Sequence, residues 1–211
     1  MKHTNCIILC LLLSACGGNE IENAVKNDLR DPDSAMFRNQ TIRNDLNLAC
    51  VEWKAKNGFG GYGGWTVADL KKVDGKWTLF DIEGSRQFSC DEQYLKNRAD
   101  YLARQERGDA AHTAAKEEAV RLLATARNLT LEDAEKLISD DPYCQEQIKT
   151  YSYDARAIAT DYVADMAKKL TDAGLKLPEG DVGRSLANPP SKKNEKRMKE
   201  VREKLKAGVC E

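Results

Sequence analysis

Histidines and paired carboxylates are the first residues of this 211-residue chain to consider for catalysis. Of the two histidines, His3 lies near the N-terminus and His112 lies among alanines, whereas a nucleophilic triad requires histidine in a pocket. Asp140 and Asp141 could carry out acid–base chemistry on glycans. They directly precede Pro142, where carboxylates more often cap a helix and favour its positive end. We therefore expect a protein that is not an enzyme and uses no cofactor or metal.

The charge balance argues against one class of partner. The chain has 33 Lys and Arg against 34 Asp and Glu, a net charge of −1, and 32% of its residues are charged. Such a chain lacks the overall positive field that holds a protein on nucleic acid. We expect no nucleic-acid partner and no small-molecule substrate.

The most unusual stretch is residues 57–65, where five of the seven positions from 58 to 64 are glycine. Glycine permits positive φ, and the interleaved aromatic rings offer flat contact surfaces. A phosphate-binding loop is excluded because no Gly-Lys-Ser/Thr follows. Two alternatives remain. The stretch is a recognition loop presenting Phe59, Tyr62 and Trp65 to a protein partner, or its aromatics fold back to complete a small core.

The N-terminus is typical of a secretory signal, with Lys2 before an apolar run over residues 6–13 and small residues after it. The run is shorter than the roughly 20 residues that span a bilayer. Leu13-Ser14-Ala15-Cys16 resembles the lipobox of bacterial lipoproteins. The resemblance implies a signal peptide over residues 1–15 and a lipid anchor on Cys16 that includes palmitate. Several acyl chains on one cysteine hold a protein stably at a membrane. Gly17 follows where Asp would favour the inner membrane, so we expect anchoring in the outer membrane, facing the periplasm.

Loss of residues 1–15 accounts for the odd count of seven cysteines. Cys6 and Cys10 leave with the signal and Cys16 takes the lipid, which leaves four. An even number in an oxidising compartment indicates two disulfides. A metal site is disfavoured because no CxxC spacing occurs. Of the three connectivities, one keeps each bridge inside one of the two segments described next: Cys50–Cys90 with Cys144–Cys210.

Composition changes near residue 90, which predicts a domain boundary. After a short tether over residues 16–21, residues 22–90 hold all three tryptophans and seven of the 14 glycines. A helical pattern ends before Pro32, and strand-like runs cover residues 46–55, 65–73 and 76–82, with 86–90 as a further edge. Asp74-Gly75 between two of these runs is a strong hairpin signal. We expect a small α+β domain, with an N-terminal helix packed on an antiparallel meander.

Residues 91–211 are rich in Ala, Glu, Lys and Leu, which predicts a helical bundle domain. A long helix covers 91–128, with a break expected at Gly108. Thr130 resembles a helix cap, and Pro142 suits the first turn of a helix whose apolar stripe continues to Gly174. A loop over residues 175–190 precedes the last helix.

That last helix, after Ser191, has eight basic and three acidic residues between Lys192 and Lys206. Its other face is apolar. Two alternatives remain for it: contact with anionic lipid headgroups, or a place in the bundle with a solvated basic side. The charge of residues 16–211 is −2, because Lys2 is the one charged side chain lost with the signal.

Residues 22–90 also resemble a small uncharacterised module of exported bacterial and prophage proteins. The resemblance lies in residues 31–35 with Phe37, in Cys50, and in residues 56–58 and 60–64. Val51 follows Cys50 where that pattern usually has glycine. The resemblance supports the domain limits and implies no known activity.

These observations predict an outer-membrane lipoprotein that binds an envelope protein through residues 57–65 or through the helical domain. The prophage resemblance suggests exclusion of phage or plasmid entry, or immunity to a toxin. One alternative is an accessory lipoprotein of a secretion or envelope complex. Another is an envelope hydrolase or an inhibitor of one.

Overall fold

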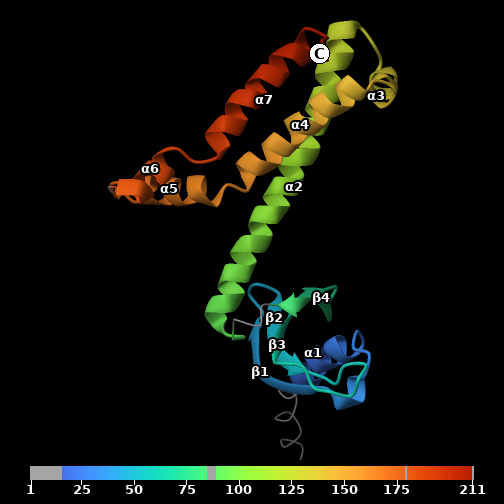
Figure 1. Ribbon diagram of the computed structural model, residues 1–211, viewed down its shortest axis with the longest axis vertical. Coiled ribbons are helices and arrows are strands. Elements are labelled where there is room, and N and C mark those ends of the chain that lie inside the picture. The colour runs from blue at the N-terminus through green and yellow to red at the C-terminus, as the bar shows by residue number, and fades with distance from the viewer. Residues whose placement is uncertain (1–15, 85–88, 179, 211) are drawn as a thin grey trace, which may run out of the picture. The chain divides into compact units, whose positions relative to one another are not determined.

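The chain divides into two compact units, and the division falls inside one long helix, between Tyr101 and Leu102. The computed structural model describes residues 16–84, 89–178 and 180–210 (Figure 1). An antiparallel sheet in the first unit and a helical second unit confirm the predicted α+β class. The predicted signal peptide lies outside the described residues. Within the described ranges, no helix has the length and apolar character needed to cross a membrane.

The first unit is a helix followed by a four-stranded meander. Each strand pairs antiparallel with the next, in the order β1-β2-β3-β4. The elements are α1 (Cys16–Lys26), the short 3-10 helix η2 (Pro32–Ser34), β1 (Met36–Arg43), β2 (Leu48–Lys54), β3 (Thr66–Val73) and β4 (Lys76–Gly84). Residues 16–21, predicted as a tether, therefore belong to α1.

The predicted turn between β3 and β4 is present. Asp74 and Gly75 have φ of 50° and 79°, the positive values that a two-residue hairpin loop requires. Strand β1 was not predicted, because its sequence lacks regular alternation. Asn39, with φ of 49°, lies where the register with β2 shifts, so this edge strand is bulged. Of the predicted edge at 86–90, residues 86–88 lie outside the described part, and Ser89 and Cys90 are not in a strand.

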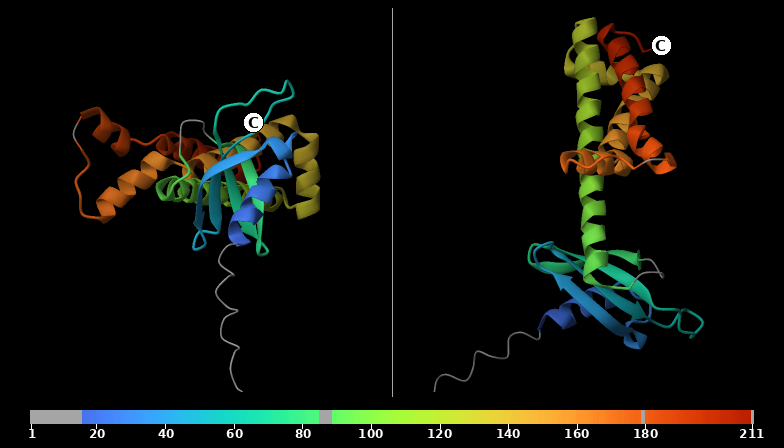
Figure 2. Two further views of the ribbon diagram at one scale, coloured as in Figure 1. Left: turned by 90° about the horizontal axis from the view of Figure 1, so that it is seen from below. Right: turned by 90° about the vertical axis from the view of Figure 1, so that its left-hand side faces the viewer.

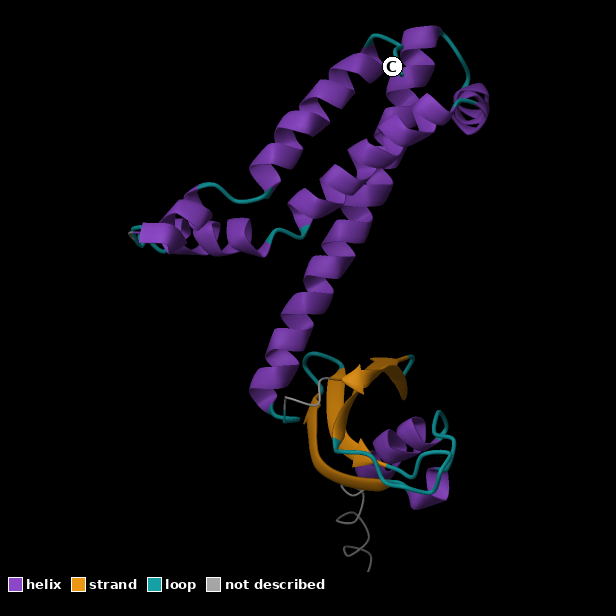
Figure 3. Ribbon diagram, in the orientation of Figure 1, coloured by secondary structure: helices purple, strands orange, loops and turns teal. Residues whose placement is uncertain are grey.

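The two faces of the sheet have different roles. The sheet curves around α1, as Figure 3 shows, and α1 buries Ile21 and Val25 against it. The sheet residues of this core are Ala49, Val51, Ala68, Leu70 and Trp77. Because side chains alternate along a strand, Cys50 and Glu52 of β2 point to the opposite face. The first turns of α2 bond to that face.

Helix α2 (Glu92–Arg127) runs through Gly108 without the predicted break. A Cβ at this position would lie 2.5 Å from Thr160 Cγ2 and 3.2 Å from Arg156 Cγ. The glycine therefore allows α2 to approach the end of α4 (Pro142–Ala159) closely. The prediction was wrong because the missing side chain serves packing, and one glycine costs a helix only about 1 kcal/mol.

Two of the predicted helix starts are confirmed. The Thr130 hydroxyl accepts a hydrogen bond from the N–H of Asp133 and caps α3 (Leu131–Asp140). Asp141 accepts from the N–H groups of Tyr143 and Cys144, while Pro142 occupies the first turn of α4. Asp141 therefore acts as a helix cap, the role that its position before a proline favoured.

The apolar stripe expected to form one helix up to Gly174 is divided. Asp161 starts a new helix, α5 (Tyr162–Asp172), by accepting from the N–H groups of Val163 and Ala164. Its other oxygen accepts from the N–H of Ser191. The segment predicted as a loop contains α6 (Gly180–Ala187). A capping carboxylate inside an apolar pattern thus ends one helix and begins another.

Helix α7 (Ser191–Lys206) begins where predicted and packs along α4 (Figure 1). Arg197 forms an ion pair with buried Asp154 of α4, and Arg202 pairs with Glu118 of α2. The basic side of α7 is thus partly used inside the second unit, which favours the bundle alternative. The core between these helices consists of Ala115, Ala119, Ile148, Tyr151, Ala155, Val201 and Leu205.

Candidate functional site

The connection between β2 and β3, residues 55–65, is held by its own hydrogen bonds. Asn57 Oδ1 accepts from the N–H groups of Phe59 (3.0 Å) and Gly61 (3.1 Å), and the Asn57 N–H donates to the Gly61 carbonyl at 2.8 Å. Gly60 has a φ of 80°, a conformation that favours glycine. An isolated bridge pairs Lys56 with Tyr62. The connection is therefore a defined loop, and it projects beyond the sheet in both views of Figure 2.

The three aromatic residues expected to bind a partner lie differently on this loop. Phe59 is 100% exposed at its tip. Tyr62 is 45% exposed, and Trp65 is half-buried at the start of β3. The alternative that the aromatic side chains fold back into the core is therefore wrong for Phe59. Trp65, by contrast, lies partly against its own sheet. Whether the three side chains bind a partner stays a prediction.

Three cations pack against the Tyr62 and Trp65 rings, and these contacts were not predicted from the sequence. Arg38 lies 4.1 Å from the centre of the Trp65 ring, and Lys54 Nζ lies 4.8 Å from the same ring. Lys54 is also 5.4 Å from the Tyr62 ring, and Lys56 is 5.8 Å from it. These five residues alternate cation and ring, and we call them the cation–aromatic ladder. Arrangements of this kind stabilise by about 0.5–1 kcal/mol per exposed pair.

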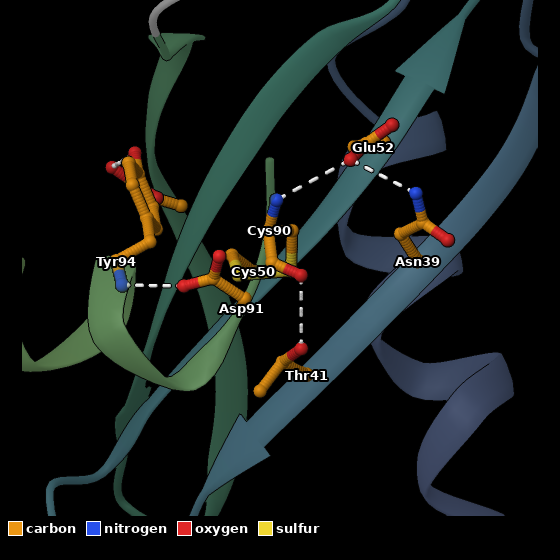
Figure 4. The surroundings of a disulfide bond; sticks show 8 residues. Asn39, Thr41, Cys50, Glu52, Cys90, Asp91 and Tyr94 are labelled. Carbon is orange, nitrogen blue, oxygen red and sulfur yellow. Dashed lines mark hydrogen bonds between the residues drawn. A yellow bond between two sulfur atoms is a disulfide. The ribbon is translucent and has the colours of Figure 1, made fainter. Parts of the chain in front are cut away.

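Buried Glu52 fixes one end of the ladder. Its carboxylate accepts from Arg38 Nε at 2.7 Å, from Asn39 Nδ2 at 3.0 Å and from the Cys90 N–H at 3.3 Å. Figure 4 shows the last two of these bonds. Burial acts to raise the pKa of Glu52, but the bonds from Asn39, Arg38 and Cys90 outweigh it and hold the pKa below its ordinary value. The carboxylate therefore stays charged and orients Arg38.

A disulfide lies beside this carboxylate. Cys50, two residues before Glu52 on the same face of β2, bonds to Cys90, the partner expected from the sequence. The Thr41 hydroxyl donates to the Cys90 carbonyl at 3.1 Å (Figure 4). Asp91 then accepts from the Tyr94 N–H at the start of α2. The bridge, Glu52 and Thr41 of β1 thus hold Cys90, just before α2, against the sheet.

A second buried carboxylate lies on the same face. Asp69, 1% exposed, accepts from the Tyr94 hydroxyl at 2.9 Å and lies 2.8 Å from Arg98 Nε. Arg98 also pairs with Asp81 at 2.5 Å. Burial raises the pKa of Asp69 to about 6, against the lowering effects of Tyr94 and Arg98, and burial likewise raises the pKa of Tyr94. This cluster joins the first turns of α2 to β3 and β4.

In the second unit, His112 packs edge-on against Tyr153, with ring centres 5.1 Å apart. Its Nδ1 is buried and has no hydrogen-bond partner among the residues that the structure describes. The two residues border an open hollow of about 340 Å³ between α2, α3 and α4. Cys144 and Cys210 form the second disulfide, again the expected pair.

Lipidation of Cys16 stays a prediction. Its backbone starts α1, and residues 13–15 of the lipobox lie outside the described part. Among the residues the structure does describe, no group of three or more His, Cys, Asp or Glu side chains could hold a metal ion. Comparison with protein-family models, with curated proteins and with solved structures finds no match. The candidate site therefore rests on its own geometry.

Proposed function

We propose that this chain is a lipoprotein anchored in the outer membrane that binds an envelope protein through the β2–β3 loop. The lipobox pattern at Cys16 supports the anchor, and the two disulfides agree with an oxidising compartment. One observation carries the binding function. A fully exposed Phe59 stands at the tip of a loop whose backbone is hydrogen-bonded through Asn57.

Energetics favour binding over a purely structural role for this side chain. Burying an exposed Phe yields about 1.5–3 kcal/mol, and Phe59 gains none of this within its own unit. A loop already ordered by internal hydrogen bonds loses little entropy on binding, which increases affinity. Phe59 therefore suits a partner pocket, with Tyr62 and Trp65 behind it.

The biological role within this class is also a proposal. A lipid-anchored protein that captures one other protein would suit exclusion of phage or plasmid entry, or immunity to a toxin. An accessory role in a secretion or envelope complex would use the same anchor and loop. A hydrolase is less well supported, because Asp141 caps α4 and His112 packs against Tyr153.

The anchor is tested by Cys16→Ala, with Cys10→Ala as the matched control inside the proposed signal. We expect Cys16→Ala to abolish labelling by radioactive palmitate and leave unprocessed protein, while Cys10→Ala is processed and labelled normally. Equal palmitate labelling of both variants would exclude Cys16 as the lipid site.

The binding function is tested by crosslinking in intact cells. Phe59→Ala and the triple variant of Phe59, Tyr62 and Trp65 are compared with Tyr143→Ala, a control that removes a 69% exposed aromatic from α4. We expect the loop variants to lose a crosslinked species that the wild type and the control retain. An identical pattern in all four proteins would remove the loop from consideration.

A further inference from the structure

We infer that the protein bound by the loop presents a carboxylate-rich segment to the cation–aromatic ladder. The inference rests on the proposed function and specifies the chemistry of the partner. Phe59 would supply an apolar contact at the loop tip, and Arg38, Lys54 and Lys56 would pair with the partner's acidic side chains.

The charges of the ladder are available for such a partner. Among the described residues, neither Lys54 nor Lys56 forms an ion pair, and each is held by an aromatic ring. A ring attracts an ammonium through its quadrupole and leaves the positive charge in place, unlike a carboxylate. Arg38 does pair with Glu52, but its side chain is 49% exposed. The rings thus orient cations without neutralising them.

A fourth cation adds to this surface. A Cβ at Gly58 would lie 2.8 Å from Arg30 Nη1, so the Arg30 guanidinium rests against the loop where Gly58 has no side chain. Arg30 is itself exposed. Four basic side chains therefore border one loop, a field that accelerates association with an acidic surface and selects against a basic one.

The position of the loop on its unit favours a protein partner over the bilayer that would hold the anchor. α1 begins at Cys16 and, at 1.5 Å per residue, extends about 16 Å. Its last residue, Lys26, packs over Phe37 of β1 at 5.5 Å, and Arg30 just beyond contacts the loop. The loop thus lies beside the end of α1 remote from Cys16, as the right-hand view of Figure 2 shows.

The test uses the full chain reconstituted in neutral phosphatidylcholine vesicles and a fluorescent poly-L-glutamate peptide as the probe. The double variant Lys54→Gln/Lys56→Gln is compared with Lys72→Gln/Lys76→Gln. The control pair, Lys72 of β3 and Lys76 of β4, flanks the Asp74-Gly75 turn, and Lys72 also packs on a ring, that of Trp77, at 5.3 Å. We expect the ladder variant to bind the peptide about five- to tenfold more weakly, as two partly exposed charge pairs predict, and the control to bind like the wild type.

Three results would overturn the inference. The first is no binding of poly-L-glutamate by the wild type, and the second is an equal loss in both lysine variants. The third is more effective displacement of the probe by glycerophosphoglycerol, a soluble lipid headgroup, than by unlabelled poly-L-glutamate. That result would assign the ladder to anionic lipid. The two competitors are compared at equal concentrations of negative charge.

Crosslinking in cells separates failure of this inference from failure of the proposed function. Loss of the crosslinked partner in both Phe59→Ala and Lys54→Gln/Lys56→Gln supports an acidic partner. If Phe59→Ala loses the partner and the lysine variant keeps it, the loop binds a protein but the acidic segment is wrong. If both variants keep it, the proposed function itself is wrong.

Discussion

Arg38 contacts Trp65 on one side and Glu52 on the other. Its guanidinium lies 4.1 Å from the centre of the indole ring, and its Nε donates to the Glu52 carboxylate at 2.7 Å. The half-buried Trp65 ring is thereby connected to a buried charge. Buried Glu52 therefore positions Arg38 at the base of the loop. Substitutions at Glu52 should change the position of Arg38 in the cation–aromatic ladder.

Glu52→Gln should destabilise the first unit by about 2–3 kcal/mol. The amide lacks the negative charge to which Arg38, Asn39 and the Cys90 N–H all donate. Its NH2 group would also face one of these donors, so that a buried hydrogen bond is lost. Urea denaturation followed by tryptophan fluorescence measures the change, with exposed Glu20→Gln on α1 as the control. If the free energy of unfolding falls no more than in the control, the hydrogen bonds to Glu52 do not stabilise the unit.

Asp69→Asn should change how stability depends on pH. The pKa of Asp69 is about 6 in the folded protein, above its ordinary 3.8, so the native state binds this proton more tightly. The resulting stability is fully present below about pH 4 and is lost as pH rises through 6. From the two pKa values, wild type should lose about 2 kcal/mol relative to Asp69→Asn between pH 4 and pH 7.

The measurement is urea denaturation of both proteins across this range, with the disulfides intact. Subtracting the variant from the wild type removes the contribution of the other carboxylates. Asp28→Asn, at an exposed position of the same unit, serves as the control for removing a carboxylate. A constant difference between wild type and Asp69→Asn would contradict the raised pKa.

Gly108→Ala should destabilise the second unit by about 1–3 kcal/mol, although alanine is the better helix former. The new Cβ would lie 2.5 Å from Thr160 Cγ2. Thr160→Ser removes that methyl group and retains the hydroxyl, which donates to the Arg156 carbonyl at 3.0 Å. The double variant should therefore regain most of the lost stability in thermal denaturation. An increase in stability on Gly108→Ala alone would disprove the close contact.

Asn57→Ala and Gly60→Ala should each loosen the β2–β3 loop. The first removes the acceptor for the Phe59 and Gly61 N–H groups. The second forces an alanine to a φ of 80°, at a cost of about 1 kcal/mol. Limited chymotrypsin digestion after Phe59 should accelerate severalfold in both. Gly63→Ala is the matched control, because a Cβ there meets nothing within 4 Å and its φ is not positive. Equal cleavage of all three would argue against an ordered loop.

Local signals predicted much of the fold. The Asp74-Gly75 turn, the cap at Thr130 and the proline start of α4 were predicted because each depends on the chemistry of a few adjacent residues. The disulfide pairing followed from the order of the cysteines and the change in composition between the two halves.

Features that depend on distant residues were not predicted. The role of Gly108 depends on Thr160, more than fifty positions away in the sequence. From the sequence alone, the glycine was therefore predicted to break the helix. Likewise, the aromatic residues of the loop stood out, but Arg38 comes to Trp65 only through pairing of β1 with β2 and of β2 with β3. No local pattern marks a cation that tertiary structure brings to a ring.

The order of the bridges has a consequence for biogenesis. Each bridge joins cysteines that are consecutive among the four, Cys50 with Cys90 and Cys144 with Cys210. A chain emerging N-terminus first into an oxidising space, as proposed here, would expose one native pair before the next cysteine appeared. Oxidation in order of arrival then yields the native bonds, so maturation would depend on a thiol oxidant and place little demand on a disulfide isomerase.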